Sequence, residues 1–385
     1  MSVASTPVID PVALTRDLIR RPSVTPADEG AMDVLERALT GLGFHCRRMK
    51  FEDIENLYAR RGTASPNLCF AGHTDVVPTG STEAWSSGPF EAEVKDGILY
   101  GRGAVDMKGG IAAWVAAVSQ VLAEGEVPGS LSFLITGDEE GPALHGTKRV
   151  VQALMAEGEV IDACVVGEPS SQHALGDMIK IGRRGSLNTW ITVHGKQGHV
   201  AYPDRAANPV PVLARLVARL ADHKLDAGYE AFQPSNLELT TLDVGNPATN
   251  LIPAEALGRL NIRFNPNHTG ESLMAWLNAE AGKAQAESGL RIELEHLHSG
   301  DAFLTQTGPF VTGVQDAVEA AVGRRPEAST TGGTSDARFI RAMCPVLELG
   351  LVGQTMHQID ERVETKDLVE LADIYQAILD RTFQS

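Results

Sequence analysis

Histidine and carboxylate side chains stand directly after four apolar runs of the sequence, each run typical of a buried strand. In open α/β sheets, ligands collect beyond the carboxyl ends of the strands, so side chains that follow separate strands converge on one rim. A single such residue is more simply explained as a helix cap or a surface carboxylate, but agreement among four strand ends favours a binding site. The residues and runs are His73 and Asp75 after 67–71, Glu139 and Glu140 after 130–136, Glu168 after 163–166, and His357 a short loop beyond 346–349.

His73 and Asp75 are two residues apart, and on an extended backbone such side chains point to the same side. His73 can therefore ligate a metal ion while the carboxylate of Asp75 accepts a hydrogen bond from the other ring nitrogen, which fixes the tautomer. An isolated pair of this kind is weak evidence, so its weight comes from the other strand ends.

Asp106 lies between a glycine-rich turn and an alanine-rich helix expected at 108–123. It can simply cap that helix. A carboxylate also has two oxygens, with which it can bridge metal ions about 3.5–4 Å apart. The sequence leaves both interpretations open at this point.

Glu139 and Glu140 are adjacent, so they cannot easily present the same face to a ligand. One should bind metal while the other moves protons, because a carboxylate beside a metal-bound water is the usual general base of metal-assisted hydrolysis. The spacing does not say which is which. Three ligand carboxylates and one hydroxide neutralise two divalent cations, and a mixed histidine and carboxylate set suits zinc, although cobalt or manganese can occupy it.

Composition limits the classes of protein to which this chain can belong. The 385 residues are 43% hydrophobic and 22% charged, which is typical of a soluble globular protein. The net charge is −17 and no basic cluster exceeds a pair of arginines, so we expect no nucleic-acid partner. No run approaches the roughly 18 apolar residues of a membrane span, and the N-terminus lacks the pattern of a secretory signal. The four scattered cysteines are expected to be reduced, which favours the cytoplasm.

Apolar runs that alternate with helical patterns predict an α/β fold, with a layered, mixed but mainly parallel sheet flanked by helices. The middle of the chain differs, because its β-rich segments are typical of an antiparallel sheet with one covered face. We therefore expect a catalytic domain in two parts, 1–180 and 293–385, and an inserted α+β domain at 181–292 with two helices. The expected helices are 11–19, about 25–43, 108–123, 146–156, 209–223, 271–287 and 309–322, and the β-rich segments of the insert are 186–194, 237–242 and 257–264.

The motifs around these residues resemble the dinuclear zinc deacylases related to acetylornithine deacetylase and carboxypeptidase G. They are GHTDVVPTG, LYGRGAVDMKGG, TGDEEGPALHGT, VVGEPS, GRRGSL, GHVAYP and TTGGTSDARF, and the match covers almost the whole chain. Within that family the pattern is most similar to bacterial enzymes that hydrolyse N-succinyl-LL-2,6-diaminopimelate to succinate and LL-2,6-diaminopimelate. The resemblance implies this zinc-dependent step of lysine and diaminopimelate biosynthesis, with an acetylornithine deacetylase-like deacylase or a dipeptidase as the alternative.

The resemblance assigns five side chains to two zinc ions, for which cobalt can substitute. Asp106 would bridge the two ions. His73 and Glu168 would complete one site, and Glu140 and His357 would complete the other.

For the reaction itself, the resemblance makes Glu139 the general base and Asp75 the acid that orients a ligand. His199 resembles a family histidine that reaches into the partner subunit's active site and stabilises the oxyanion, which implies a homodimer with the insert as its dimerisation domain. The alternative for His199 is an ordinary surface histidine. In this family the bond after the bridging aspartate, here Asp106–Met107, is often cis.

Further matches imply contacts with a small-molecule substrate. Asn250 and Arg263 match family positions that contact the substrate. Arg183 or Arg184 is a candidate for binding a carboxylate, because the planar guanidinium suits bidentate recognition, although either arginine can equally form a structural ion pair. The same role is expected of the segment 331–334, with Thr331, Gly332 and Thr334.

Two other classes of function are disfavoured. A non-catalytic protein with this fold would be expected to have lost the general base or a ligand, yet every such position is filled. A serine or cysteine nucleophile is disfavoured because no G-x-S-x-G motif is present and the cysteines lack nearby catalytic partners. One departure limits the resemblance, since Gly353 stands where many relatives carry an asparagine, and no substrate contact of that asparagine can be transferred.

Overall fold

The computed structural model describes residues 7–383 and divides the chain into two compact units. Unit 1 extends to Ile181 and resumes at Thr305–Ser329 and from Ser335 onward, and unit 2 comprises Gly182–Leu304 and Thr330–Thr334. Unit 2 thus extends beyond position 292, where the sequence analysis ended the insert, and the domain limits drawn there stay a prediction. Residues 1–6, part of the segment in which no secretory signal is expected, lie outside the described residues.

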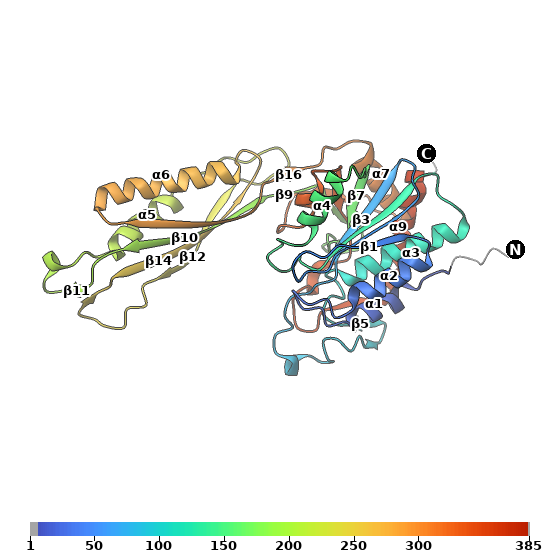
Figure 1. Ribbon diagram of the computed structural model, residues 1–385, viewed down its shortest axis with the longest axis horizontal. Coiled ribbons are helices and arrows are strands. Elements are labelled where there is room, and N and C mark those ends of the chain that lie inside the picture. Colours follow the sequence, from blue (N-terminus) through green and yellow to red (C-terminus); the bar gives the residue numbers. More distant parts are fainter. Residues whose placement is uncertain (1–6, 384–385) are drawn as a thin grey trace. The chain divides into compact units, whose positions relative to one another are not determined.

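An eight-stranded mixed sheet forms the centre of unit 1 (Figure 1). In spatial order its strands are β1 (His45–Arg48), β2 (Leu57–Arg61), β6 (Ser130–Thr136), β3 (Asn67–His73), β7 (Ala163–Val166), β18 (Val346–Glu348), β8 (Met178–Lys180) and β17 (Glu327–Ser329). The four strands from β6 to β18 are parallel to one another, and β8 is parallel to β17. The pairs β1–β2, β2–β6 and β18–β8 are antiparallel. The predicted mixed, mainly parallel sheet is confirmed.

Helices flank this sheet, as predicted. They are α1 (Pro11–Ile19), α2 (Ala31–Gly41), α3 (Lys108–Glu124), α4 (Thr147–Ala156), α7 (Pro309–Val322), α8 (Ala337–Ile340) and α9 (Thr365–Phe383). Asp10 caps α1, since its Oδ1 accepts from the backbone N–H of Val12 at 2.8 Å. The predicted start of α2 near position 25 is wrong, because the Asp28 carboxylate binds the backbone N–H groups of Gly30 and Met32 and so begins the helix later.

Aromatic side chains join these helices to the sheet. Trp114 of α3 stacks on Phe70 of β3 with ring centroids 4.8 Å apart, and meets the ring of Tyr375 of α9 edge-on at 4.7 Å. The Tyr375 hydroxyl donates to the carbonyl oxygen of Leu349, 2.6 Å away. Since all three rings are fully buried, this packing holds β3 and the segment after β18 in place.

A three-stranded sheet in unit 1 consists of β4 (Val94–Lys95), β5 (Ile98–Tyr100) and β19 (Arg362–Glu364). The antiparallel pairing of β5 with β19 brings segment 98–106 beside the segment that follows His357. Asp106 ends the first segment and His357 precedes the second, so the pairing brings together the backbone near two candidate ligands that are far apart in the sequence.

Unit 2 is built on a four-stranded antiparallel sheet, with α5 (Val210–Ala221) and α6 (Gly270–Ser288) on one face (Figure 1). Its strands are β12 (Asn236–Asp243), β14 (Glu255–Phe264), β10 (Gly185–His194) and β15 (Ile292–Gly300). Alternate residues such as Leu187, Ile191 and Val193 of β10 are buried with the apolar faces of the helices. The predicted antiparallel sheet with two helices is therefore confirmed. Two short ribbons join it, β9 (Gly182–Arg183) with β16 (Phe303–Leu304), and β11 (Gly198–His199) with β13 (Leu251–Ile252).

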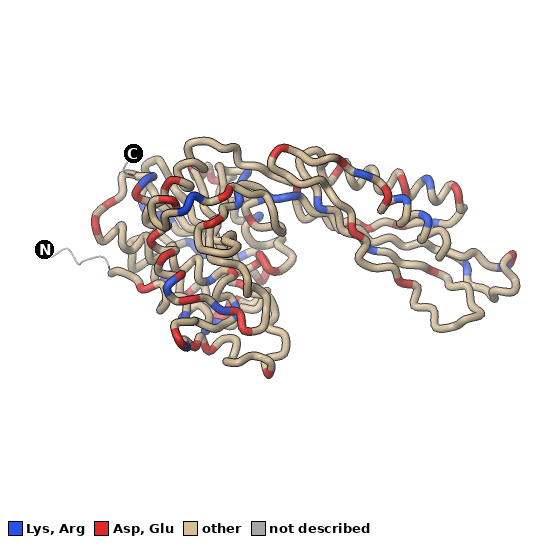
Figure 2. The backbone as a smooth tube through the Cα atoms, turned by 180° about the vertical axis from the view of Figure 1, so that it is seen from behind, with Lys and Arg blue, Asp and Glu red and all other residues tan. Residues whose placement is uncertain are grey.

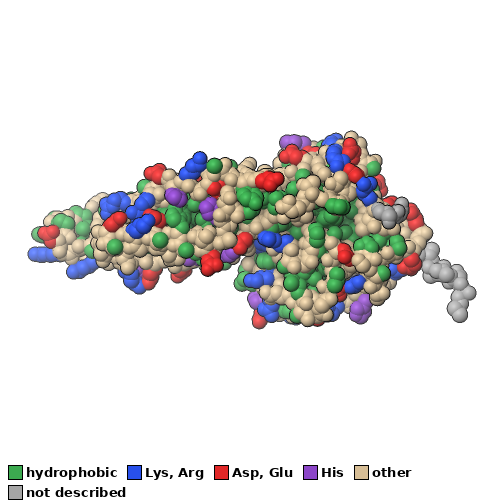
Figure 3. Space-filling view, turned by 90° about the horizontal axis from the view of Figure 1, so that it is seen from above, with side chains coloured by type: hydrophobic (Ala, Val, Ile, Leu, Met, Phe, Trp, Pro, Cys, Tyr) green, Lys and Arg blue, Asp and Glu red, His purple; other side chains and the backbone are tan. Residues whose placement is uncertain are grey.

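Charged residues of both signs are spread along the two units. Lys and Arg are interspersed with Asp and Glu along the backbone (Figure 2), and both signs also occur on the face shown in Figure 3. Among the described residues, none of the helices combines the length and the apolar character that a membrane crossing requires. All four cysteines are free thiols.

Candidate metal centre

Two histidines and four carboxylates of unit 1 converge beyond the carboxyl ends of its central strands. His73 is the last residue of β3, and Glu168 lies two residues after β7. Glu139 and Glu140 lie in the loop after β6, and Asp106 lies just before α3. His357 lies in the loop between β18 and β19. These separate segments therefore converge at one rim, as expected from the sequence.

Asp106 presents one carboxylate oxygen to each histidine. Its Oδ1 lies 3.2 Å from Nε2 of His73, and its Oδ2 lies 3.2 Å from Nε2 of His357. No side chain caps α3, so the alternative that Asp106 is only a helix cap is wrong. The following peptide bond, Asp106–Met107, is cis. The two oxygens of the Asp106 carboxylate thus contact different histidines.

The other carboxylates complete two groups of donor atoms. Nε2 of His73 lies 3.8 Å from Oε1 of Glu168, and Nε2 of His357 lies 2.9 Å from Oε1 of Glu140. Donor atoms of His73, Asp106 and Glu140 lie within 4.8 Å of one another, as do those of His73, Glu139 and Glu168. Glu139 thus shares a group with two predicted ligands.

The electrostatics of this group of donor atoms favour the binding of divalent cations. Burial, with the charges of Asp106 and Glu139, raises the pKa of Glu168 well above its usual value. Several carboxylates crowded into a buried space repel one another, and a cation there removes this repulsion. Hydrogen bonds to Asp106 and Glu140 raise the pKa of His357 to about 10 in the metal-free protein, so a bound metal ion has to displace a proton.

Glu139 and Glu140 face different neighbours, as expected for adjacent residues. Glu140 meets His357, whereas burial raises the pKa of Glu139 well above its usual value, and the charges of Asp336 and Glu140 raise it further. A carboxyl group with a raised pKa is suited to taking up and returning a proton near neutral pH. Asp336 was missed as a neighbour of the site, although it lies in the quoted motif TTGGTSDARF.

Asp75 supports the site differently from the prediction. Nδ1 of His73 lies 2.9 Å from the backbone carbonyl oxygen of Asp75, and it lies 3.7 Å from the Asp75 carboxylate. That carboxylate instead accepts from the backbone N–H groups of Glu139 and Glu140, at 3.2 and 3.0 Å. The predicted side-chain contact fails because β3 ends at His73, so the two residues are no longer on one extended strand. The Asp75 carboxylate therefore positions the loop that carries both glutamates.

A close approach of the backbone explains one of the glycines in the DMKGG segment. A Cβ added at Gly110 would lie 2.6 Å from the carbonyl oxygen of Gly167, which directly precedes Glu168. Glycine therefore lets the first turn of α3 pack against the end of β7. Nearby Lys108 is fully buried and donates to the carbonyl oxygen of Arg21 at 2.8 Å, as expected of a structural residue.

In unit 2, His199 lies in the β11–β13 ribbon, and Asn250 directly precedes β13. His199 pairs with Leu251, and the backbone N–H of Val200 donates to the carbonyl oxygen of Asn250. Nδ1 of His199 accepts from the backbone N–H of Ala201 at 3.1 Å. This contact places the proton of the neutral ring on Nε2, and the exposed side chain can donate it to a ligand.

The predicted carboxylate-binding residues of unit 2 form two groups. Nη1 of Arg183 donates to the carbonyl oxygen of Thr331 at 3.2 Å, and a Cβ at Gly332 would overlap the same guanidinium. Burial lowers the pKa of Arg263, and the charge of nearby Arg184 lowers it further. Nε of Arg263 donates to Oδ1 of Asn261 at 3.1 Å, and Nη1 of Arg184 donates to Oδ1 of Asn236 at 2.8 Å. Thr334 is half-buried.

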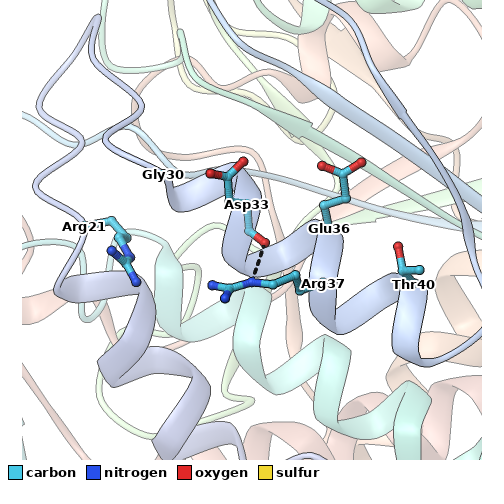
Figure 4. A pocket seen from close by; sticks show the side chains of 6 residues that line it. All are labelled: Arg21, Gly30, Asp33, Glu36, Arg37 and Thr40. Carbon is cyan, nitrogen blue, oxygen red and sulfur yellow. Dashed lines mark hydrogen bonds between the residues drawn. The ribbon is translucent and has the colours of Figure 1, made fainter.

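A separate recess of about 740 Å³ lies on α2 (Figure 4). Its lining contains none of the predicted site residues and consists of Arg21, Gly30, Asp33, Glu36, Arg37 and Thr40. The two acids in it are paired with Arg48, at 2.5 Å for Asp33 and 2.9 Å for Glu36. The recess therefore plays no part in the centre described above.

The model of peptidase family M20/M25/M40 matches residues 69–381 of the chain. The chain belongs to this family. It is 65% identical over 383 residues to a protein of Caulobacter sp. (strain K31) named succinyl-diaminopimelate desuccinylase, covering 99% of this chain and 98% of that protein. A protein of the same name from Parvibaculum lavamentivorans is 53% identical over 375 residues, covering 96% of this chain and 95% of the relative.

Solved structures share the fold of this chain. The metallo-carboxypeptidase Sso-CP2 from Sulfolobus solfataricus matches with a TM-score of 0.82 at 17% identity, covering 97% of this chain and 99% of that chain. The aminopeptidase PepT from Bacillus cereus matches with a TM-score of 0.81 at 20% identity, covering 97% and 98%. As an M20 family member the chain is a metallohydrolase that acts on an amide bond, as the sequence analysis predicted.

Proposed function

We propose that this M20 family member hydrolyses N-succinyl-LL-2,6-diaminopimelate to succinate and LL-2,6-diaminopimelate. One observation carries the proposal: the cluster of two histidines and four carboxylates occurs in a chain 65% identical, over almost its full length, to a protein named for this reaction. The reaction belongs to lysine and diaminopimelate biosynthesis. A cytoplasmic location is part of the proposal and is supported by the four free thiols.

Two zinc ions are the proposed cofactors, and cobalt is expected to substitute for them. His73 and Glu168 would hold one ion, Glu140 and His357 the other, and Asp106 would bridge both. The mixture of imidazole and carboxylate donors supports zinc. When bound, the ions supply Lewis acidity, which polarises the amide carbonyl and lowers the pKa of water towards about 7.

Glu139 is the proposed general base. Its carboxylate accepts a proton from water as the water oxygen attacks the carbonyl carbon of the succinyl amide. The C–N bond then breaks, and Glu139 returns the proton to the departing amine. The Asp75 carboxylate holds the backbone N–H of Glu139 at 3.2 Å and so limits the movement of this base between the two steps.

We further propose a homodimer in which the partner subunit's His199 donates a hydrogen bond to the oxyanion of the tetrahedral intermediate. The proton on Nε2 of the neutral ring supports this role, since an oxyanion needs a donor. The sheet face of unit 2 opposite its helices supports self-association, because it exposes Trp190, Leu257 and Leu297.

Carboxylates of the substrate are proposed to bind the arginines and backbone groups of unit 2. A succinyl group and a diaminopimelate moiety both carry carboxylates, and guanidinium groups bind carboxylates with two parallel hydrogen bonds. Arg183, with Thr331, Gly332 and Thr334, is one proposed anchor, and Arg263 with Asn250 is the other. Gly353 has no side chain and so contributes no side-chain contact to the substrate.

Steady-state assays on a matched set of substrates test the assignment. We expect kcat/KM for succinyl-diaminopimelate to exceed that for acetylornithine and for each member of a dipeptide panel by at least about a hundredfold. A higher kcat/KM for acetylornithine or a dipeptide would replace this function with a related deacylase or dipeptidase. The same assay after chelation separates metal dependence from substrate preference.

A further inference from the structure

Glu361 and Arg102 form a buried ion pair beside the candidate metal centre, and neither belongs to the predicted ligand set. Glu361 has no exposed surface, and Arg102 is 2% exposed. Oε2 of Glu361 lies 2.7 Å from Nη1 of Arg102. Removing two charges from water is costly, so a buried ion pair is weakly stabilising at best compared with an apolar pair. Its location therefore points to a role in orienting its neighbours.

Glu361 holds the backbone of the proposed bridging ligand. Its Oε1 accepts from the backbone N–H groups of Asp106, at 3.2 Å, and of Val105, at 2.9 Å. Its own carbonyl oxygen accepts from the backbone N–H of Gly101 at 2.9 Å. Segment 101–106 is thus attached to Glu361 at both of its ends, which fixes the direction in which the Asp106 side chain leaves the backbone.

Arg102 holds the loop that carries another proposed ligand, His357. Its Nη2 donates to the carbonyl oxygen of His357 at 3.3 Å, and its Nη1 donates to that of Gln358 at 3.2 Å. His357 has a φ of 62°, a left-handed conformation that residues with a Cβ adopt only when their surroundings impose it. The planar guanidinium, stacked 5.3 Å from the Trp85 ring centroid, supplies such a constraint.

We propose that Arg102 and Glu361 are positioning residues that set the spacing between Asp106 and His357. They would thereby hold the cation that His357 helps to bind, and this inference rests on the proposed two-cation site. The ion pair links the two ligands directly, because Glu361 contacts the backbone of Asp106 and Arg102 contacts that of His357.

The two proposed cation positions differ in how strongly they need this link. His73 is 1% exposed, ends a central strand and is fixed by the hydrogen bond to the carbonyl oxygen of Asp75. The side chain of His357 is 47% exposed and lies on a loop. Loss of the ion pair should therefore weaken the His357 position and spare the His73 position.

The experiment measures binding of Co²⁺ to metal-free protein by equilibrium dialysis and by the visible absorption of bound cobalt. The variants are Glu361→Gln and Arg102→Lys in the full chain. Glutamine keeps one oxygen for the backbone N–H groups but turns an amide N–H towards Arg102. Lysine keeps the charge but loses the fork that spans two carbonyl oxygens. In both variants we expect the first equivalent to bind as in wild type, and the second at least about tenfold more weakly.

Glu159→Gln is the control, because Glu159 pairs with Arg60 in a partly buried ion pair of unit 1 that lies outside the predicted ligand set. It should bind both equivalents as wild type does. The inference is overturned if the variants retain the second equivalent at wild-type affinity, if they lose both equivalents equally, or if neither variant folds by circular dichroism. If wild type binds fewer than two equivalents, the proposed function fails, and that result is distinct from a failure of the ion pair.

Discussion

The candidate residues of unit 1 and those of unit 2 are held in place in different ways. In unit 1, Asp106 contacts both His73 and His357, so each group is fixed by other members of the same cluster. In unit 2, His199 is exposed on a short ribbon, and Arg183 contacts the backbone. The proposed catalytic groups are thus fixed by one another within unit 1, whereas the proposed recognition residues of unit 2 are held by neighbouring backbone and side-chain groups.

Replacement of the proposed base in unit 1 should have the largest effect. Glu139→Gln keeps the size of the side chain and removes its ability to take a proton, so kcat should fall by about 10²–10⁴-fold. Metal content, measured on the same preparation, should stay at the wild-type value. Turnover within a few-fold of wild type would show that another group moves the proton.

Replacement of His199 tests the corresponding claim for unit 2. His199→Ala should lower kcat by about 10²–10³-fold, because it removes a donor to the oxyanion. His194→Ala is the control, since His194 lies in the same unit between Glu255 and Glu293.

Mixing two inactive variants tests whether His199 acts across a dimer. A mixed dimer of Glu139→Gln and His199→Ala holds one site with both residues intact, so random mixing should restore about a quarter of the wild-type activity. Absence of any recovery, with mixed dimers demonstrated by mass spectrometry, would place His199 outside the partner's site.

A milder change in unit 2 should alter substrate binding without altering the chemistry. Arg263→Lys loses the planar fork, so KM should rise about tenfold with kcat little changed. Arg259→Lys, on the same face of the same strand, should leave both constants near wild type. Equal effects of the two substitutions would indicate a general effect on the strand.

The pH dependence of metal binding should reflect the protonation of His357, the more exposed of the two candidate histidine ligands. Hydrogen bonds raise the pKa of His357 to about 10 in the metal-free protein, so below that pH a bound metal ion displaces its proton. Affinity for the second cation should therefore rise about tenfold per pH unit between about 7 and 9, measured by competition with a chelator. By the same linkage, the stabilisation from protonated His357 is complete below its unfolded pKa, about 6.5, and is lost as the pH rises through 10. An affinity independent of pH would contradict this prediction.

The smallest expected effect lies behind the site, in the core of unit 1. Tyr375→Phe removes the hydrogen bond to the carbonyl oxygen of Leu349 and should lower the free energy of unfolding by about 1 kcal/mol. The kinetic constants should not change. A urea titration and a parallel activity assay check both statements, and a loss of bound metal would mean that this core hydrogen bond controls the site directly.

The fold could be predicted from the sequence wherever local patterns agree with tertiary packing. The apolar runs at 130–136 and 163–166 form β6 and β7, and the histidine and carboxylates that follow the strands do converge. The start of α2 was wrong because the Asp28 carboxylate, a short-range polar contact, sets it.

Contacts made by the backbone were not predictable from the sequence. The partner of the His73 ring is the carbonyl oxygen of Asp75, which no residue type reveals. Glu361 was missed for the same reason, because its partners include the backbone N–H groups of Val105 and Asp106. Its position four residues after His357 was the only signal in the sequence.

Metal content measured together with turnover of succinyl-diaminopimelate tests the central claim most directly. We expect about two zinc ions per subunit, loss of turnover on chelation, and recovery of turnover when two equivalents of zinc or cobalt are restored. Full turnover in the chelated protein, with metal shown to be absent, would contradict the account.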